Sequence, residues 1–409
     1  MKKSLLALAV LSAFAGAASA QSSVTLYGTL DLSGKYVKND GSNKRLSLSQ
    51  DGINSSQLGF RGVEDLGGGL KAGFNLLAGV NADTGTTNVA TTPNNAGALL
   101  GPTGAPAAPA AGPTAGNAQN NQSKFFNRRS TVSLFSNAGE LRLGRDYTSS
   151  FWNQTLFDAF GTNGLGNSLN VRQVYNGTRM DNAISYLTPA NLGGFYGQAQ
   201  VAAAEGGSSL DRPARYIGGR VGFAAGPFDV AVSYARERFA NSFGFLVPNG
   251  VPGNNAFGLF IPGGSTATQN TWNIGGSYDF GVLKLLGYFD HESLEHFSER
   301  DYHVSMVIPM GQGEVHLGYN RSNATTGTKS ATGAAVSNNV FGPTAKSLVV
   351  QYAATYQYNL SKRTAMYGTA SLLENRDNTR FSAGGTSVTA APTAGGKSKG
   401  FELGVRHFF

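Results

Sequence analysis

The segment SLVVQYAATYQYN (347–359) alternates apolar and polar side chains with a period of two residues. One side of this alternation carries Leu348, Val350, Tyr352, Ala354, Tyr356 and Tyr358, and the other carries Ser347, Gln351, Thr355, Gln357 and Asn359. Successive residues of a β-strand point to opposite faces, whereas an amphipathic helix repeats about every 3.6 residues. The segment therefore predicts a strand with an apolar medium on one face and polar groups on the other.

The same alternation recurs along most of the chain, for example in SVTLYGTLDLSGK (23–35) and in the last residues, FELGVRHFF (401–409). In the last segment Phe401, Leu403, Val405 and Phe409 share one face, while Glu402 and Arg406 lie on the other. We find no helical repeat of useful length beyond residue 20. The pattern predicts an all-β protein.

The first twenty residues, MKKSLLALAVLSAFAGAASA, have a different character. Lys2 and Lys3 precede a short apolar run, which is followed by small residues up to Ala20. A basic start, an apolar core and a small-x-small cleavage site are typical of a secretory signal peptide. We favour this interpretation of residues 1–20 over a buried N-terminal helix, and we expect a mature domain of residues 21–409.

Composition narrows the class of protein. Only 14% of the residues are charged, against about 25% in ordinary soluble domains. The basic residues are spread singly, which argues against a nucleic-acid surface, and there is no cysteine. No later stretch reaches the roughly 20 apolar residues of a spanning helix. A soluble secreted protein and a β-barrel in an outer membrane remain, since lipid admits only helices and closed barrels.

The connections between the predicted strands alternate in length. Short ones are expected at 64–71, 136–141, 189–195, 224–229, 279–284, 310–315 and 359–364, and longer ones near 38–53, 83–123, 146–178, 205–213, 239–268, 293–300, 323–345 and 376–397. Seven short and eight long connections join sixteen strands, an even number with the loop asymmetry of an outer-membrane barrel. A β-sandwich, the alternative, would not sort its loops so regularly. The last strand (398–409) should then close against the first (23–37), and the Ala/Gly/Pro-rich segment 83–123 should form a long external loop.

Several stretches resemble one known family. They are SVTLYGTLD (23–31), LGFRGVEDLGGGLKAGF (58–74), RRSTVSLFSNAGELRLGR (128–145), RMDNAISYLTPANLGGF (179–195), NLSKRT (359–364) and GVRHFF (404–409). In this order they resemble the trimeric general porins of Gram-negative bacteria, in the β-proteobacterial branch of Neisseria, Burkholderia and Comamonas. The resemblance covers the whole mature chain.

The resemblance implies a sixteen-stranded antiparallel transmembrane β-barrel that works as a homotrimer among outer-membrane lipid and lipopolysaccharide. It implies a third long loop folded into the lumen, passive diffusion of small hydrophilic solutes and ions, and a modest preference for anions. A substrate-specific channel on the same barrel is the alternative. It also implies that the terminal aromatic residue, Phe409, is a signal for the outer-membrane insertion machinery.

The alternation of inward and outward residues along each predicted strand, which we call parity, selects candidate residues for the inner wall. In LGFRGVE (58–64), for example, outward Leu58 and Phe60 place Arg61 inside. The same reasoning gives a basic set, namely Lys35, Arg61, Arg129, Arg142, Arg179 and Arg220. Such a set would concentrate positive potential in the lumen and draw anions. Each of these residues could instead lie at a mouth of the barrel or pair with a wall carboxylate.

The predicted constriction loop, 146–178, is rich in aromatic residues, which should pack against the inner wall. Its FDAFG segment (157–161) takes the place of the family's acidic-x-Phe-Gly motif, which nominates Asp158, Phe160 and Gly161, with Asp146 as a second acid. Two positions depart from the family: Ala159 replaces a frequent proline, and Gln57 replaces a frequent arginine.

Catalytic and metal sites are not expected, and no cofactor is predicted. The five histidines are scattered, and the absence of cysteine excludes thiol chemistry. HESLEH (291–296) lacks the His-Glu-x-x-His spacing of a helical zinc site. We interpret it as the start of a solvated external loop.

Overall fold

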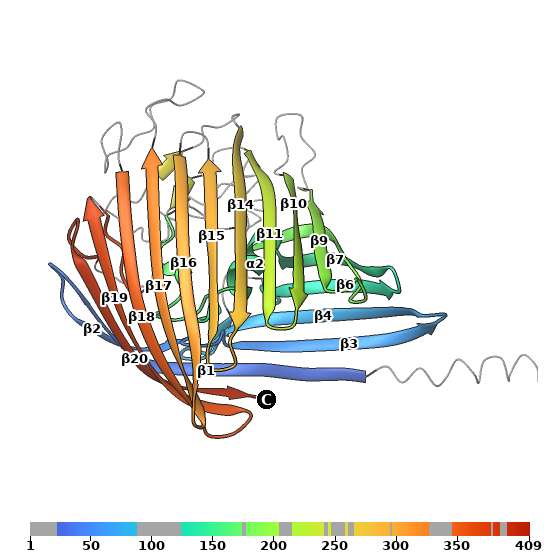
Figure 1. Cartoon of the computed structure of the whole chain (residues 1–409), viewed down its shortest axis with the longest axis horizontal. Coiled ribbons are helices and arrows are strands. Elements are labelled where there is room, and N and C mark those ends of the chain that lie inside the picture. Colours follow the sequence, from blue (N-terminus) through green and yellow to red (C-terminus); the bar gives the residue numbers. More distant parts are fainter. Residues whose placement is uncertain are drawn as a thin grey trace, which may run out of the picture.

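Sixteen antiparallel strands form a closed barrel (Figure 1). The computed structural model describes residues 23–87, 124–173, 177–203, 215–240, 244–246, 258–260, 266–294, 297–326, 346–377, 379–384 and 391–409. The predicted signal peptide and nearly all of the predicted 83–123 loop lie outside these residues. Within the described part, no helix is long and apolar enough to cross a membrane.

The barrel strands follow one another in chain order around the ring. They are β1 (Ser23–Asn39), β3 (Gln57–Gly67), β4 (Leu70–Asn81), β6 (Arg129–Ser136), β7 (Gly139–Tyr147), β8 (Arg179–Leu187), β9 (Phe195–Ala202), β10 (Arg215–Ala225), β11 (Phe228–Ala240), β14 (Thr266–Asp279), β15 (Lys284–Leu294), β16 (Phe297–Met310), β17 (Gly313–Thr326), β18 (Lys346–Asn359), β19 (Thr364–Asp377) and β20 (Lys397–Phe408). The seven short connections fall where the sequence predicts them, all at one end of the barrel.

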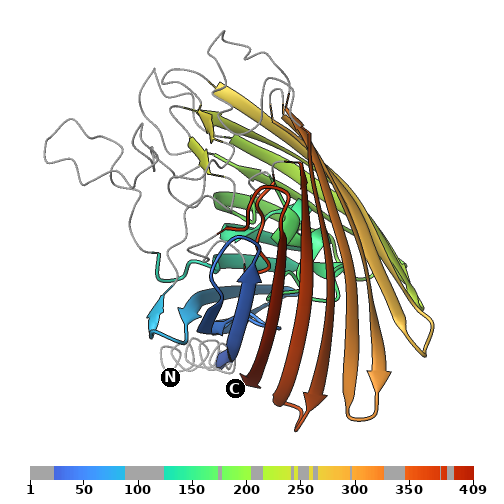
Figure 2. The same cartoon turned by 90° about the vertical axis from the view of Figure 1, so that its left-hand side faces the viewer.

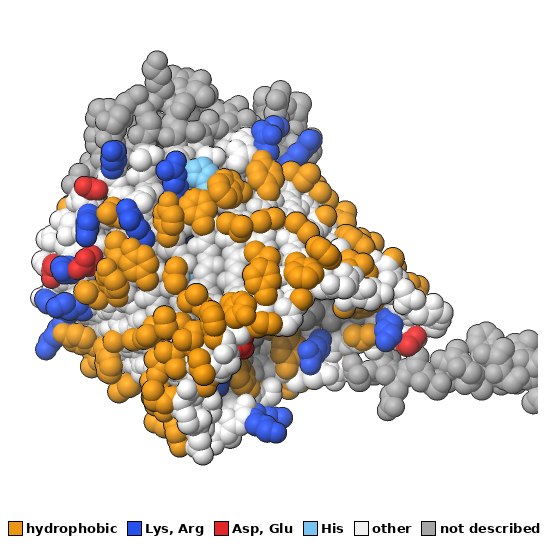
Figure 3. Space-filling view, viewed as in Figure 1, with side chains coloured by type: hydrophobic (Ala, Val, Ile, Leu, Met, Phe, Trp, Pro, Cys, Tyr) orange, Lys and Arg blue, Asp and Glu red, His pale blue; other side chains and the backbone are white. Residues whose placement is uncertain are grey.

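The two faces of the wall meet different surroundings. On β18, Tyr352 is 49% exposed while the adjacent Gln351 is fully buried. The same alternation gives most of the barrel strands an apolar outer face, and orange side chains cover much of the outer wall in Figure 3. The inner face carries the polar residues, as the period-two pattern predicts.

Short additional strands lie outside the ring. β2 (Arg45–Gln50) pairs with β1, β5 (Thr86–Thr87) pairs with β4, and β12 (Gly244–Leu246) pairs with β13 (Gly258–Phe260). β2 therefore occupies part of the predicted loop near 38–53.

One predicted loop is wrong. The sequence predicts a long connection at 293–300, but β15 runs to Leu294 and β16 begins at Phe297. Both strands of this hairpin continue their inward and outward alternation to the end, which leaves room for only a very short connection. The charged residues of HESLEH misled the prediction, because in a porous barrel charged side chains also occur on the inner wall.

The barrel closes between the first and last strands, as predicted. β1 pairs with β20 from Thr29 opposite Phe408 to Asn39 opposite Ser398. The final residue extends this ladder, since the Phe409 amide donates to the Gly28 carbonyl at 3.1 Å and the Gly28 amide donates to the Phe409 carbonyl at 3.1 Å. The ladder between the first and last strands therefore continues to Phe409.

Closure depends on the missing side chain at position 28. A Cβ atom there would lie 2.6 Å from the backbone oxygen of Gln57 and would overlap the ring of Phe409. We expect Gly28→Val to destabilise the barrel by about 1–3 kcal/mol, the cost typical of overpacking, measured as a lower unfolding temperature in detergent. Gly34→Val on the same strand is the matched control, because a Cβ there meets nothing within 4 Å. Equal stability of the two variants would contradict the prediction.

Candidate functional site

The connection from β7 to β8 folds into the barrel instead of extending away from it. We call residues 148–178 the inward loop; its residues 174–176 lie outside the described part. It contains the helix α2 (Ser149–Leu156) and the 3₁₀ helix η2 (Ser168–Val171). Figures 1 and 2 place α2 behind the strands, inside the ring. The strand-dominated sequence pattern does not predict this helix, which is only eight residues long.

Polar contacts fix α2 to the inner wall. The Thr148 hydroxyl caps the helix by accepting from the Phe151 amide, as an N-cap residue does. The Asn153 amide donates to Asn273 at 3.0 Å, and the Gln154 amide donates to Asp290 at 3.1 Å. The outgoing limb of the inward loop is thus attached to β14 and β15.

Two aromatic side chains of the inward loop lie where the wall has no side chain. Phe157 covers Gly275 and Phe160 covers Gly318, and a Cβ atom at either glycine would overlap the ring. Phe157 is 1% exposed and Phe160 is 6% exposed. These rings therefore fill the space between loop and wall and do not project into the open lumen.

The Asp158 carboxylate closes the middle of the loop. It accepts hydrogen bonds from the Phe160 amide at 2.8 Å, the Ser168 amide at 3.0 Å and the Ser168 hydroxyl at 2.6 Å. His303 of the wall lies 3.5 Å away. Asp158 is 4% exposed, so its carboxylate is covered by the loop and the wall and does not face the open lumen. Gly161, with φ +55°, follows in the turn that this carboxylate holds.

We call residues 148–157 of the inward loop its outgoing limb and residues 162–173 its return limb. Arg172 attaches the return limb to the inner wall. Its guanidinium donates to Asp290 at 2.9 Å and to Glu292, and it lies 3.9 Å from Asp301. Burial alone would lower the pKa of Arg172, but the surrounding carboxylates Glu292 and Asp290 raise it well above its usual range. The arginine is therefore fully charged.

The interpretation of HESLEH as a solvated loop is wrong. His291 and Glu292 belong to β15, and Glu292 is 1% exposed beneath Arg172. Sequence reasoning missed this contact and Arg172 itself. The usable signal is the alternation of β15, which places Asp290 and Glu292 on its inner face.

A second segment also turns into the lumen. The amides of Ile53 and Asn54 donate to the Asp31 carboxylate at 2.8 and 2.7 Å, and the Ser55 hydroxyl donates to Asn163 of the inward loop at 2.7 Å. Burial raises the pKa of the Asp51 carboxyl in the same turn. The inward loop therefore spans the lumen from β7 to this turn, a contact that no pattern in the sequence predicts.

Two of the predicted basic residues pair with acids on their own wall. Arg129 lies 2.7 Å from Asp146, and Arg142 lies 2.5 Å from Asp146 and 2.7 Å from Glu140. Asp146 is a residue of β7, so it lies in the wall and not in the inward loop as expected. Its carboxylate neutralises part of the basic set.

Other arginines face the lumen without an ion pair within 4.0 Å in the described part of the chain, among them Arg61, Arg128, Arg179, Arg220 and Arg406. Arg61 is exposed, with its guanidinium 5.2 Å from the centre of the Tyr27 ring. Arg128 and Arg179 both donate to the Tyr147 hydroxyl, at 3.2 and 2.8 Å. The sequence does not predict Arg128, because this residue precedes its strand and parity does not place it.

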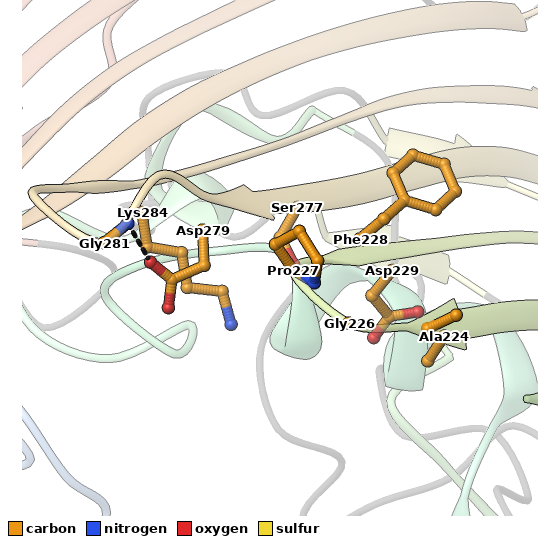
Figure 4. Close-up of a pocket in the computed structure, with 10 residues that line it drawn as sticks. Ala224, Gly226, Pro227, Phe228, Asp229, Ser277, Asp279, Gly281 and Lys284 are labelled. Carbon is orange, nitrogen blue, oxygen red and sulfur yellow. Dashed lines mark hydrogen bonds between the residues drawn. The ribbon is translucent and has the colours of Figure 1, made fainter.

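Lys35 lies apart from these arginines, and two cavities lie elsewhere on the barrel. Lys35 is 3.6 Å from Glu402 and lines a cavity of about 460 Å³ with Arg45 and Asp51. A second cavity, of about 580 Å³, lies between the turns that join β10 to β11 and β14 to β15, where Figure 4 shows Asp279 and Lys284. This cavity belongs to the short-turn mouth of the barrel. Among the described residues no group of acidic or histidine side chains could hold a metal ion.

A closed barrel with an apolar outside, a polar inside and an inward loop defines a membrane channel of the porin class. Residues 7–378 match the Gram-negative porin family. The chain belongs to this family, and it is an outer-membrane channel protein, not an enzyme.

Individual relatives agree with this assignment. The chain is 34% identical to outer membrane porin protein 32 of Delftia acidovorans over the full length of both, and 29% identical to an outer membrane porin of Bordetella pertussis over 92% of this chain and 95% of that one. Its structure resembles that of an anion-selective porin from Comamonas acidovorans, with a TM-score of 0.70, 30% identity and coverage of 95% of this chain and 100% of that one.

The placement of Asp158 yields a test of its role. We expect Asp158→Asn to weaken the attachment of the inward loop by about 1–3 kcal/mol, because one acceptor oxygen is lost, while leaving ion selectivity unchanged. The measurement is the reversal potential of a planar bilayer under a salt gradient, together with current noise. A clear shift of the reversal potential towards anion selectivity would show that this charge faces the water after all.

Proposed function

We propose that this porin is a diffusion channel for small hydrophilic solutes and ions that prefers anions. The separation of charge across the inward loop is the observation that carries the proposal. Carboxylates of β15 and β16 lie behind the loop, where Asp290, Glu292 and Glu299 are at most 1% exposed. Elsewhere on the inner wall, Arg61 is exposed, and Arg128, Arg179 and Arg220 are partly exposed without an ion pair among the described residues, although Arg220 also donates to Asn153 of α2 at 3.3 Å.

Burial decides which charges an ion passing through the lumen meets. A charge covered by protein and paired with Arg172 contributes little to the potential in the water, whereas an unpaired guanidinium in a low-dielectric channel contributes strongly. We therefore place Arg61, Arg128, Arg179 and Arg220 in the selectivity set. Arg129 and Arg142 contribute less, since Asp146 and Glu140 balance them, and Asp158 is left out.

The structurally similar porin from Comamonas acidovorans is anion-selective. This similarity supports the sign of the proposed preference. It leaves the particular residues to be tested in this chain.

Charge reversal at Arg61 tests the proposal. We expect Arg61→Glu to lower the anion-to-cation permeability ratio by roughly threefold or more, because the potential in the lumen changes by at least about one kT. Reversal potentials across a planar bilayer under a salt gradient measure the ratio.

Arg236→Glu is the matched control. Arg236 is exposed on the outer face of β11, so the same change of charge should have a much smaller effect. A cation-selective wild-type channel would overturn the proposal, as would equal effects of the two variants.

Export and assembly are also proposed. We propose cleavage after Ala20, recognition of Phe409 by the insertion machinery, and assembly into a homotrimer, as the family resemblance implies. An intact mass equal to that of a chain beginning at Gln21 would support cleavage after Ala20. A lower yield of folded Phe409→Ala barrel in the outer membrane would support recognition of Phe409. Gels of unheated and boiled samples test the homotrimer, because a monomer in mild detergent would contradict it.

A further inference from the structure

Four acidic side chains form a two-by-two array on the inner face of β15 and β16, which we call the acidic ladder. Asp290 lies directly opposite Asp301, and Glu292 lies directly opposite Glu299. Like charges directly opposite each other destabilise a sheet. All four residues are at most 6% exposed, so water does not screen them.

The inward loop supplies a positive charge at the centre of this array. Arg172, whose side chain is 3% exposed, pairs with Asp290, Glu292 and Asp301. Its planar guanidinium can donate to more than one carboxylate at once, which a lysine ammonium on a flexible stem does less well. The neighbouring residue, Gln173, donates its amide to Glu299 at 2.6 Å and its side chain to Ser322 at 3.0 Å.

The ladder holds both limbs of the loop. One oxygen of Asp290 accepts from Gln154 of α2, and the other accepts from Arg172 of the return limb. The outgoing limb has further contacts, including Asn153 on Asn273 and Phe157 over Gly275. The return limb packs Leu165 and Val171 against Val349 and Leu373 of the wall, and Arg172 joins it to the ladder by ion pairs.

We propose that Arg172 is a positioning residue that sets the width of the pore: it holds the return limb of the inward loop against the acidic ladder. Without this cation the buried ladder acids lose their counter-ion, and each acid that stays ionised gains hydration when the gap opens to water. Water then enters between loop and wall, and the return limb moves away from β15 and β16. Arg172 touches no permeating ion in the closed arrangement, so its effect passes through the loop.

Replacement of Arg172 by glutamine tests the proposal. We expect Arg172→Gln to raise single-channel conductance by roughly 1.5-fold or more, because conductance follows the water-filled cross-section, and to admit larger neutral saccharides in a liposome-swelling assay. Arg236→Gln, which removes an exposed positive charge from the outer face of β11, is the control. Neither readout depends on the sign of ion selectivity, so this inference can fail while the proposed anion preference stands.

A rescue separates charge from packing. In the triple variant Arg172→Gln with Asp290→Asn and Glu292→Gln, two of the repelling charges are gone, and neutral amides can bind one another across the gap. We expect conductance and size limit to return most of the way to wild type. If Arg172 merely filled space, the triple variant would be at least as open as the single variant.

Each outcome decides the matter. Wild-type conductance and size limit in a folded Arg172→Gln barrel would overturn the proposal, and so would a triple variant no closer to wild type than the single variant. If Arg172→Gln alone fails to fold, the triple variant decides: a folded channel with nearly wild-type conductance supports the role of Arg172 as counter-ion, and a triple variant that also fails to fold overturns it.

Discussion

Every backbone amide and carbonyl of the wall must find a partner within the protein, because the hydrocarbon of a bilayer offers none. This constraint accounts for the closed ring, in which each barrel strand has a neighbour on both sides. It also accounts for the period-two pattern, since the same strand must face lipid on one side and water on the other. Irregular backbone occurs where it is tolerated, in the loops at the two mouths and inside the lumen.

The lumen is organised by an uneven distribution of charge. The inward loop covers the carboxylates of Asp290, Glu292 and Glu299, whereas Arg61 on the wall stays in contact with water. In the proposed channel, one segment therefore narrows the lumen and also determines which charges a passing ion meets. Two wall glycines, Gly275 and Gly318, let the loop approach closely enough for both effects, because the rings of Phe157 and Phe160 occupy the space that side chains would need.

The sequence predicted the barrel well, since alternation and loop length are local properties that lipid enforces. It predicted the site less well. Parity correctly assigns a residue such as Arg61 to a face, but it cannot tell whether a lumen-facing charge is paired, as Arg142 is, or covered, as Glu292 is. Asp158 matches a family motif and yet forms hydrogen bonds within the loop. Arg172 showed no pattern at all, because its partners lie more than a hundred residues away in the chain. Contacts between a loop and a distant wall are set by tertiary packing, which no local repeat records.

The pairing of β1 with β20 also determines when the protein can fold. The two strands lie far apart in the chain, and the hydrogen bonds at one end of their ladder join Gly28 to Phe409. Without β20, β1 lacks one neighbour, and the wall would expose an unpaired edge. Ring closure over nearly the entire chain carries a large entropic cost and slows folding. The wall can therefore become a closed ring only when β1 and β20, from opposite parts of the chain, have met.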